Sequence, residues 1–244
     1  MTTTSTTRYG QRYEEALSYA ARLHATQLRK GDPRSPASIP YVAHLLEVSS
    51  LVWMGGGDED QAIAGLLHDA LEDQGESTSP AELERRFGPR VRTIVEACSD
   101  GAPDMPRGPS TWLSRKVAYL ATLHDTHHAD AMVVTVAVKV SNARAIVDDL
   151  LVASGSEAPA AATVSFWSRF NAPPEAIAWY YTEVLAAALA WDPSHPLVAR
   201  LAPLVDLIVL DAGGTDVQGA FGLSDEALAA DMAALTAAKT PTGH

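Results

Sequence analysis

The stretch DQAIAGLLHDALED, residues 60–73, combines a helical pattern with an unusual group of polar side chains. Its apolar residues recur at spacings of three and four, which predicts a helix that buries one stripe. His68 and Asp69 end the apolar run where the pattern would otherwise continue the core, and Glu72 and Asp73 follow directly. We therefore expect a helical scaffold that directs polar groups toward a site.

Turn and capping signals divide the neighbouring sequence into further helices. Residues 55–57 are three glycines that end a helix, and Asp58 can cap the next one. Ser79 before Pro80 predicts another helix start, with a break at residues 88–89 into two short helices. Other helices with the same periodicity are expected at residues 13–28, 41–54, 60–71, 111–124, 129–150, 173–191 and 196–210.

The remaining segments favour an all-α fold, a compact helical bundle. The valine-rich residues 132–140 could be read as a strand, but their flanks follow the helical pattern, so a helix is the preferred interpretation. Residues 101–110 are rich in Pro and Gly and are expected to lack regular structure, and residues 154–161 form a second predicted loop. We find no internal repeat and no strand ladder in the sequence.

The expected domain organisation is one folded domain with loosely ordered ends. Residues 1–8 are rich in Thr and Ser and are expected to be disordered, residues 9–212 form the domain, and residues 213–244 form a flexible or loosely packed tail with at most one helix. A chain of 244 residues with 47% hydrophobic residues can bury one good core.

Charge and targeting signals limit the possible functions. Lys and Arg total 18 against 30 Asp and Glu, a formal net charge of -12, which disfavours binding to a nucleic-acid polymer because like charges repel. A local basic cluster can still bind a small nucleotide. The sequence shows no secretory signal and no membrane-spanning run, and its single cysteine, Cys98, cannot form an internal disulfide. We expect a cytoplasmic protein with no membrane partner.

The polar residues suit a metal site. His44 lies in a segment that is otherwise faced with apolar residues, and the pair His68-Asp69 ends another. A mixed set of imidazoles and carboxylates suits Zn, Mn or Fe, and such an ion can activate water and offset the charge of a phosphate. Glu72 follows His68 by one helical turn, as a general acid or base would. Taken alone, the His-Asp dipeptide fits a capped helix end with surface carboxylates better than it fits a functional site.

Several motifs in order resemble the hydrolase half of the RelA/SpoT family and its small single-domain relatives. The motifs are HATQLRKG at 24–31, IPYVAH at 39–44, LLHDALED at 66–73, FGPRV at 87–91 with Ser99-Asp100, NARAI at 142–146, RFN at 169–171 and WYY at 179–181. The resemblance implies an all-α fold of the HD-domain type. It also implies a metal-dependent pyrophosphohydrolase that removes the 3′-diphosphate from guanosine tetra- or pentaphosphate.

The same resemblance implies roles for individual residues. His44, His68 and Asp69 match metal ligands, with Mn the expected ion and Zn or Fe as alternatives. Glu72 and Asp73 match the catalytic pair that orients or activates the attacking water. The positions that it implies for nucleotide binding are Arg29 and Lys30, which would meet the base and a phosphate, together with Ser99, Arg115, Lys116, Asn142 and Tyr180.

The chain departs from the family at the fourth metal ligand. The family has an Asp in a phrase close to Ala-Asp-Lys-Leu-x-Asn-x-Arg, whereas residues 137–144 read AVKVSNAR and place Val138 there. An isopropyl group cannot bind a cation, so weaker binding is expected. Three interpretations stay open. Asn142 or Asp100 could take the place of the missing ligand, or a site with three ligands could keep low or altered activity. The protein could also be a degenerate relative that binds a nucleotide without cleaving it.

Two further alternatives stay open. An HD-type enzyme can act on a substrate other than a nucleotide, because a fold does not fix a function. The apolar residues 186–189 and 204–210 could form the interface of a homo-oligomer, although helix packing within one chain is the preferred interpretation.

Overall fold

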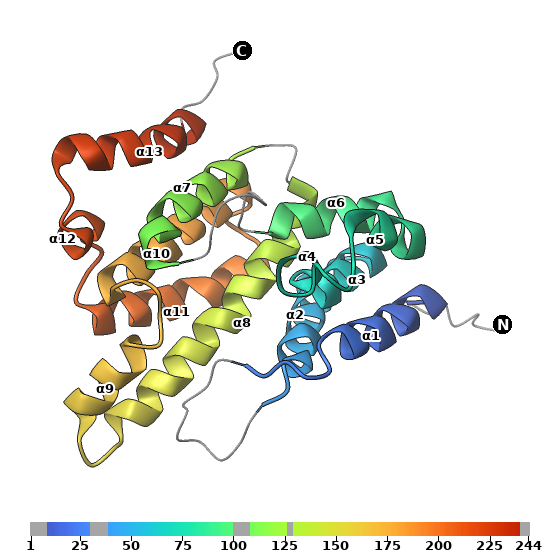
Figure 1. Ribbon diagram of the computed structural model, residues 1–244, viewed down its shortest axis with the longest axis horizontal. Helices are drawn as coiled ribbons and strands as arrows, with labels where there is room; N and C mark the ends of the chain where they lie inside the picture. Colours follow the sequence, from blue (N-terminus) through green and yellow to red (C-terminus); the bar gives the residue numbers. More distant parts are fainter. Residues whose placement is uncertain (1–8, 30–38, 100–107, 126–128, 240–244) are drawn as a thin grey trace. The chain divides into compact units, whose positions relative to one another are not determined.

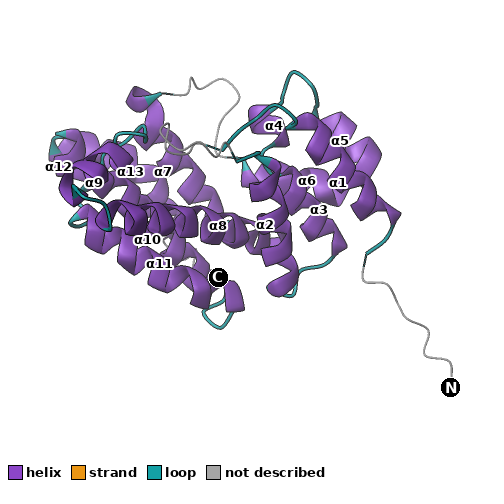
Figure 2. Cartoon of the chain, turned by 90° about the horizontal axis from the view of Figure 1, so that it is seen from below, coloured by secondary structure: helices purple, strands orange, loops and turns teal. Residues whose placement is uncertain are grey.

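Helices form the regular structure in the computed structural model of the protein, which describes residues 9–29, 39–99, 108–125 and 129–239 (Figure 1). Across these residues the cartoon shows no strand (Figure 2), and β-pairing is limited to an isolated antiparallel bridge between Leu28 and Pro40. The predicted all-α fold is thereby confirmed. No helix among the described residues is both long and apolar enough to cross a membrane.

The chain divides into two compact units, residues 1–99 and 100–244, which are described separately. The sequence favours one domain over residues 9–212 and does not predict a boundary at this point. Its position directly follows the end of a helix at Cys98, where the Pro/Gly-rich segment begins.

The first unit is organised around a short, almost fully buried helix. This helix, α3 (Glu59–Leu67), buries every residue from Ala62 to Leu67 because α1, α2 and α6 pack around it. Asp58 caps its start, as expected, and the structure shows in addition that it forms a capping box with Gln61. The other helices of this unit are α1 (Gln11–Leu23), α2 (Val42–Met54), α4 (Ala70–Asp73), α5 (Pro80–Phe87) and α6 (Pro89–Cys98).

Two helix ends in this unit differ from the prediction. Helix α1 ends at Leu23 rather than near residue 28, because the following residues turn away and form the bridge to Pro40. Helix α3 ends at Leu67, and a new helix starts at Ala70, so His68 and Asp69 lie between two helices rather than inside one. The predicted break between α5 and α6 is found at Gly88, whose φ of 93° favours glycine.

The second unit is built on one long helix, α8 (Ala129–Ser154), against which α9, α10 and α11 pack. The valine-rich residues are helical because α8 is buried on all sides from Ala131 to Val138, and a helix surrounded by protein needs no polar face. The other elements are the 3-10 helix η1 (Pro109–Thr111), α7 (Trp112–Leu123), α9 (Pro159–Trp167), α10 (Pro174–Trp191), α11 (Pro196–Ala212), α12 (Val217–Phe221) and α13 (Asp225–Lys239).

Three segments of the second unit are more regular than the sequence indicated. Helix α9 starts at Pro159, inside the predicted loop 154–161, and η1 begins at Pro109, inside the predicted loop 101–110. After Gly213, where at most one loose helix was expected, α12 and α13 follow, and α13 packs against α7 with Leu235 fully buried. The expectation for residues 1–8 lies outside the described residues.

Candidate metal centre

A close approach of α2 and α3 brings the two candidate histidines together. A Cβ added to Gly65 of α3 would lie 3.3 Å from the Cα of Ser49 on α2. The Ser49 hydroxyl also donates a hydrogen bond of 2.9 Å to the carbonyl of Ala62, which ties the same two helices. Backbone packing at this crossing therefore sets the separation between His44, on α2, and His68, directly after α3.

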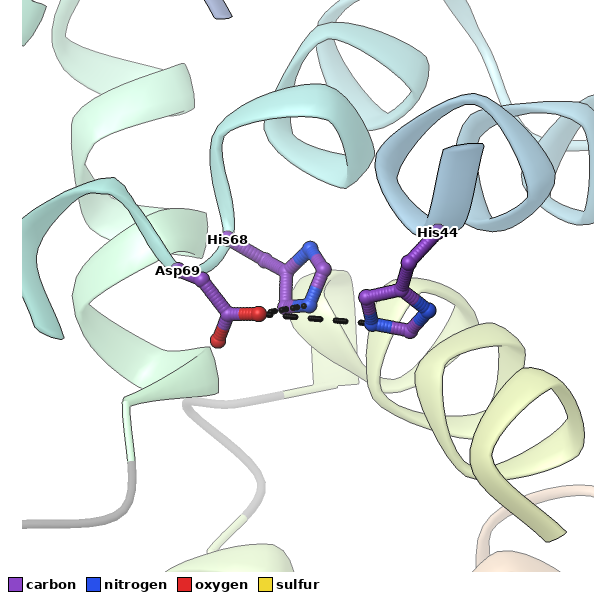
Figure 3. A group of neighbouring side chains, drawn as sticks. All are labelled: His44, His68 and Asp69. Carbon is purple, nitrogen blue, oxygen red and sulfur yellow. Dashed lines mark ion pairs between the residues drawn. The ribbon is translucent and has the colours of Figure 1, made fainter. Parts of the chain in front are cut away.

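Figure 3 shows His44, His68 and Asp69 turned toward a common point. Each offers one ligand atom, and these atoms lie within 4.8 Å of one another. Oδ2 of Asp69 is 2.9 Å from Nε2 of His68 and 4.0 Å from Nε2 of His44. The two imidazoles are almost fully buried, at 2% and 3% exposed. The structure thus brings the three predicted metal ligands together.

The orientation of His68 suits a metal ligand. Its Nδ1 donates a 2.9 Å hydrogen bond to the carbonyl of Gly65, near the end of α3. When a metal ion takes the place of the Nε2 hydrogen, an imidazole that keeps its hydrogen on Nδ1 presents the lone pair of Nε2, the atom that faces Asp69. A ligating histidine usually has this kind of backbone partner on its second nitrogen.

Asp69 is held in its ionised form. Burial alone would raise the pKa of this carboxyl, but in the absence of a metal ion the positive charge and hydrogen bond of a protonated His68, the hydroxyl of Tyr41 and then the charge of a protonated His44 outweigh burial and hold the pKa far below its usual range. The Tyr41 hydroxyl donates its hydrogen bond to Oδ2 of Asp69. Burial in the first place, and then the negative charge of Asp69, raise the pKa of Tyr41 well above its usual range. The phenol therefore stays a donor.

The three side chains fit a divalent metal ion by their chemistry. Two neutral imidazoles and one carboxylate are borderline donors that suit Zn, Mn or Fe. The donor set and the outer hydrogen bonds to Gly65 and Tyr41 both match a metal centre.

The acidic pair that follows lies next to this cluster, in α4. The charges of Asp73 and Glu72 contribute to the raised pKa of Tyr41, after burial and Asp69, so both carboxyl groups are near the phenol. Oδ2 of Asp73 accepts a 2.7 Å hydrogen bond from Nε2 of Gln27. Carboxylates beside a metal centre, rather than on it, can orient water or move a proton.

The predicted nucleotide-binding residues of the first unit are only partly described. Arg29 comes directly after Leu28, the residue that forms the bridge to Pro40. Its guanidinium lies 3.9 Å from the Glu47 carboxylate of α2. Ser99 closes α6, where its hydroxyl donates to the carbonyl of Val95 at 3.2 Å. Lys30 lies outside the described residues. Asp100, one suggested substitute for the missing ligand, also lies outside them.

The second unit brings two predicted nucleotide-binding residues into contact. The Lys116 ammonium of α7 lies 4.7 Å from the ring centroid of Tyr180 on α10, a cation–π distance. The Lys139 ammonium of α8 lies 5.2 Å from the same ring. Val138 is 7% exposed on α8, and Asn142 is half-buried one turn further along the same helix. Arg115 of α7 is also buried.

Three residues whose roles were not predicted from the sequence lie around the site: Tyr41 contacts Asp69, Gln27 contacts Asp73, and His24 contacts both Tyr41 and Gln27. All three lie inside the quoted motifs 24–31 and 39–44, which was the available signal. Their roles depend on the bridge between Leu28 and Pro40, a contact that no helical periodicity indicates.

The fold and the buried donor set define this protein as an all-α protein with a candidate divalent-metal centre. A family model described as HD domain matches residues 16–172, which is more than half of the chain and includes residues of both units. The chain belongs to the HD domain family, and the predicted fold type is confirmed.

Known relatives are similar over part of the chain. The guanosine-3′,5′-bis(diphosphate) 3′-pyrophosphohydrolase MESH1 of Xenopus tropicalis is 41% identical over 88 residues, which cover 35% of this chain and 46% of that protein. The human protein of the same name is 38% identical over 88 residues, covering 35% of this chain and 46% of the relative. The match therefore spans less than half the length of these relatives.

One solved structure supports the fold over most of the chain. It is described as a metazoan ortholog of SpoT that hydrolyzes ppGpp and plays a role in starvation responses. It is 23% identical, with a TM-score of 0.56, and the alignment covers 82% of this chain and 97% of that one. The likeness shows that the two chains share a fold.

Proposed function

We propose that this protein is a metal-dependent pyrophosphohydrolase that removes the 3′-diphosphate from guanosine tetra- or pentaphosphate. The observation that carries the proposal is the buried cluster of His44, His68 and Asp69, whose ligand atoms lie within 4.8 Å of one another. Relatives that match the chain bear the name of this activity.

His44, His68 and Asp69 would hold the ion. When bound, a divalent ion at this place lowers the pKa of water and offsets negative charge on a phosphate. Glu72 and Asp73 are proposed to orient the attacking water and accept its proton. The net reaction adds water across the bond between the 3′ oxygen and its phosphorus, and pyrophosphate leaves.

The finer assignments belong to the same proposal. Mn²⁺ is the proposed ion, because one carboxylate and two imidazoles leave room for water ligands, with Zn²⁺ or Fe²⁺ as alternatives. Arg29, Lys30, Ser99, Asn142 and the Lys116–Tyr180 pair are proposed to bind the nucleotide. A cytoplasmic location is proposed from the single cysteine of the sequence.

The experiment measures pyrophosphate release from guanosine tetraphosphate by the full chain, with and without Mn²⁺. We expect release that depends on the ion in the wild type and is lost in His68→Ala. The control is His195→Asn, which removes an imidazole that caps α11 through the Leu197 amide and replaces it with another good cap. Equal release by the wild type and His68→Ala would contradict the metal site.

A second candidate function is a module that binds the nucleotide without turnover. Val138 favours it, because valine stands where the family has its fourth metal ligand. Equilibrium binding of guanosine tetraphosphate without pyrophosphate release, at saturating Mn²⁺, would support this function. Multiple turnovers per chain would exclude it.

A further inference from the structure

We propose that His24 is a positioning residue that serves two carboxylates of the site at once. Its ring supports Tyr41, which holds Asp69. Its Nδ1 hydrogen holds Gln27, which in turn holds Asp73. This inference rests on the proposed function only in treating Asp69 as a metal ligand and Asp73 as a group that handles water.

The backbone brings together His24, Gln27 and Tyr41, the three residues that we call the clamp. His24 directly follows α1, and the chain then forms the bridge between Leu28 and Pro40. The amide of Tyr41 donates a 2.9 Å hydrogen bond to the carbonyl of Gln27, so these two residues lie side by side. The bridge thus joins the segment before it to the start of α2, which carries His44.

The first arm of the clamp is a ring stack. The centroids of the His24 and Tyr41 rings are 5.3 Å apart with an interplanar angle of 29°. His24 is 2% exposed, so its ring cannot move without repacking its surroundings. Tyr41 donates its hydroxyl to Oδ2 of Asp69, the oxygen that lies 2.9 Å from His68. The stack therefore fixes the direction of the hydrogen bond that holds a metal ligand.

The second arm is a hydrogen-bond chain whose direction can be derived. Nε2 of Gln27 donates to Oδ2 of Asp73 at 2.7 Å, because an amide nitrogen can only donate. Oε1 of Gln27 then faces Nδ1 of His24 at 2.6 Å, and it also accepts from Nε2 of Gln74 at 3.0 Å. An amide oxygen cannot donate, so the proton of a neutral His24 must be on Nδ1.

A purely space-filling role would favour a different residue. With the proton on Nδ1, the buried Nε2 of His24 is an acceptor with no hydrogen-bond partner among the described residues. A buried, unpaired acceptor is unfavourable, and a phenylalanine ring would stack on Tyr41 without that penalty. The donation from Nδ1 to Gln27 is the function that a histidine adds here.

Two substitutions separate the arms. His24→Phe keeps a ring against Tyr41 and loses the donor, whereas His24→Asn keeps a donor near the place of Nδ1 and loses the ring. For His24→Phe we expect kcat to fall about tenfold while the Kd for Mn²⁺ stays within about twofold, and for His24→Asn we expect the Kd to rise about tenfold. Tyr41→Phe, which removes the donor to Asp69, should raise the Kd about 10- to 100-fold.

The measurements are Mn²⁺ titration calorimetry on the metal-free full chain and steady-state kinetics, with circular dichroism as the fold control. Equal losses of Mn²⁺ affinity and kcat in His24→Phe and His24→Asn would overturn the two-arm proposal, as would an unchanged affinity in Tyr41→Phe. Should His24→Asn fail to fold, His24→Phe and Tyr41→Phe still decide the matter.

A separate measurement keeps this inference distinct from the proposed function. The imidazole nitrogen shifts of His24 in a ¹⁵N-labelled wild-type chain should show a hydrogen on Nδ1, and a ring that carries its hydrogen only on Nε2 would overturn the clamp. This result needs neither metal nor substrate. A wild type that takes up no Mn²⁺ and releases no pyrophosphate would therefore defeat the proposed function, while the ring protonation still decides the role of His24.

Discussion

Neighbouring residues in the HDALED segment have different partners. His68 is buried and bonded to the end of α3 through Gly65, whereas Asp69 is bonded to Tyr41 from the other side of the site. Glu72 and Asp73 lie on the next short helix, close to Tyr41 but outside the ligand cluster. This separation supports dividing the proposed roles between holding an ion and handling water.

Glu72→Gln tests that division. The amide keeps the shape of the side chain but cannot take a proton, so we expect kcat to fall by about 10²- to 10⁴-fold with little change in Mn²⁺ content. Elemental analysis and steady-state kinetics measure the two effects. Glu76→Gln, at an exposed position four residues later, is the control and should leave both unchanged. Loss of metal from Glu72→Gln would instead indicate a ligand.

At the scale of elements, the crossing of α2 and α3 is the feature on which the site depends. For Gly65→Ala, the new Cβ would lie 3.3 Å from the Ser49 Cα, a backbone atom that cannot move by itself. Alanine favours helix by about 1 kcal/mol over glycine, but overpacking costs about 1–3 kcal/mol, so we expect a net loss of stability. Urea unfolding measures it, and Gly108→Ala, with nothing near its Cβ, is the control.

The surface of α5 provides a pH-dependent contribution to stability. Hydrogen bonds from Arg85 and then Arg86 lower the pKa of Glu82 from 4.5 to about 2. Because the folded pKa is the lower one, ionised Glu82 stabilises the fold above pH 4.5, and this stabilisation is lost as the pH falls toward 2. The difference in unfolding free energy between the wild type and Glu82→Gln should therefore shrink over this range. A difference that stays constant in urea titrations would contradict the assignment.

The elements with a strong local signal were predictable from the sequence. Asp58 starts one helix where expected, and Ser79 with Pro80 starts another, because capping is decided by adjacent residues. The break after Leu67 was not predicted, since the apolar spacing continues past it. Helix α9 was missed because residues 159–164 are mostly small and carry no clear apolar stripe.

The candidate site was predictable to a similar degree. The sequence identified His44, His68 and Asp69 as candidate metal ligands, and the structure has them close together. The contacts of Tyr41 and Gln27 could not be predicted, because they arise from a tertiary bridge between Leu28 and Pro40. Periodicity describes which face of a helix is buried, and it contains no information on how loops cross.

At the scale of the whole molecule, metal binding should stabilise the fold. A ligand that binds only the folded chain adds about 2.7 kcal/mol at 100 times its Kd, and for a chain of this length each kcal/mol raises Tm by about 2–4 °C. We therefore expect Mn²⁺ at that concentration to raise Tm by about 5–10 °C in the wild type and to have no effect in His68→Ala. Calorimetry measures both, and an equal rise in the two proteins would indicate binding elsewhere.

The division into two units was the part of the architecture that the sequence did not indicate. Charge changes little near Ser99 and the motifs continue on both sides of it, so the Pro/Gly-rich segment that follows was interpreted as a loop within one domain. A boundary between units depends on which helices pack together, and helices on each side have similar apolar stripes. Local patterns therefore predicted the elements better than their grouping.

His68 interacts with α3 through Nδ1 and with Asp69 through Nε2, and this pair of interactions affects how such chains can change over evolutionary time. Its Nδ1 satisfies a carbonyl near the end of α3, so selection for folding alone would preserve this histidine after catalysis had been lost. Glu72 lies on the separate short helix α4, and its proposed role is in catalysis rather than in ending α3. In descendants of this chain that drift away from hydrolysis, the acidic residue should disappear first, and a surviving histidine would reveal ancestry rather than activity.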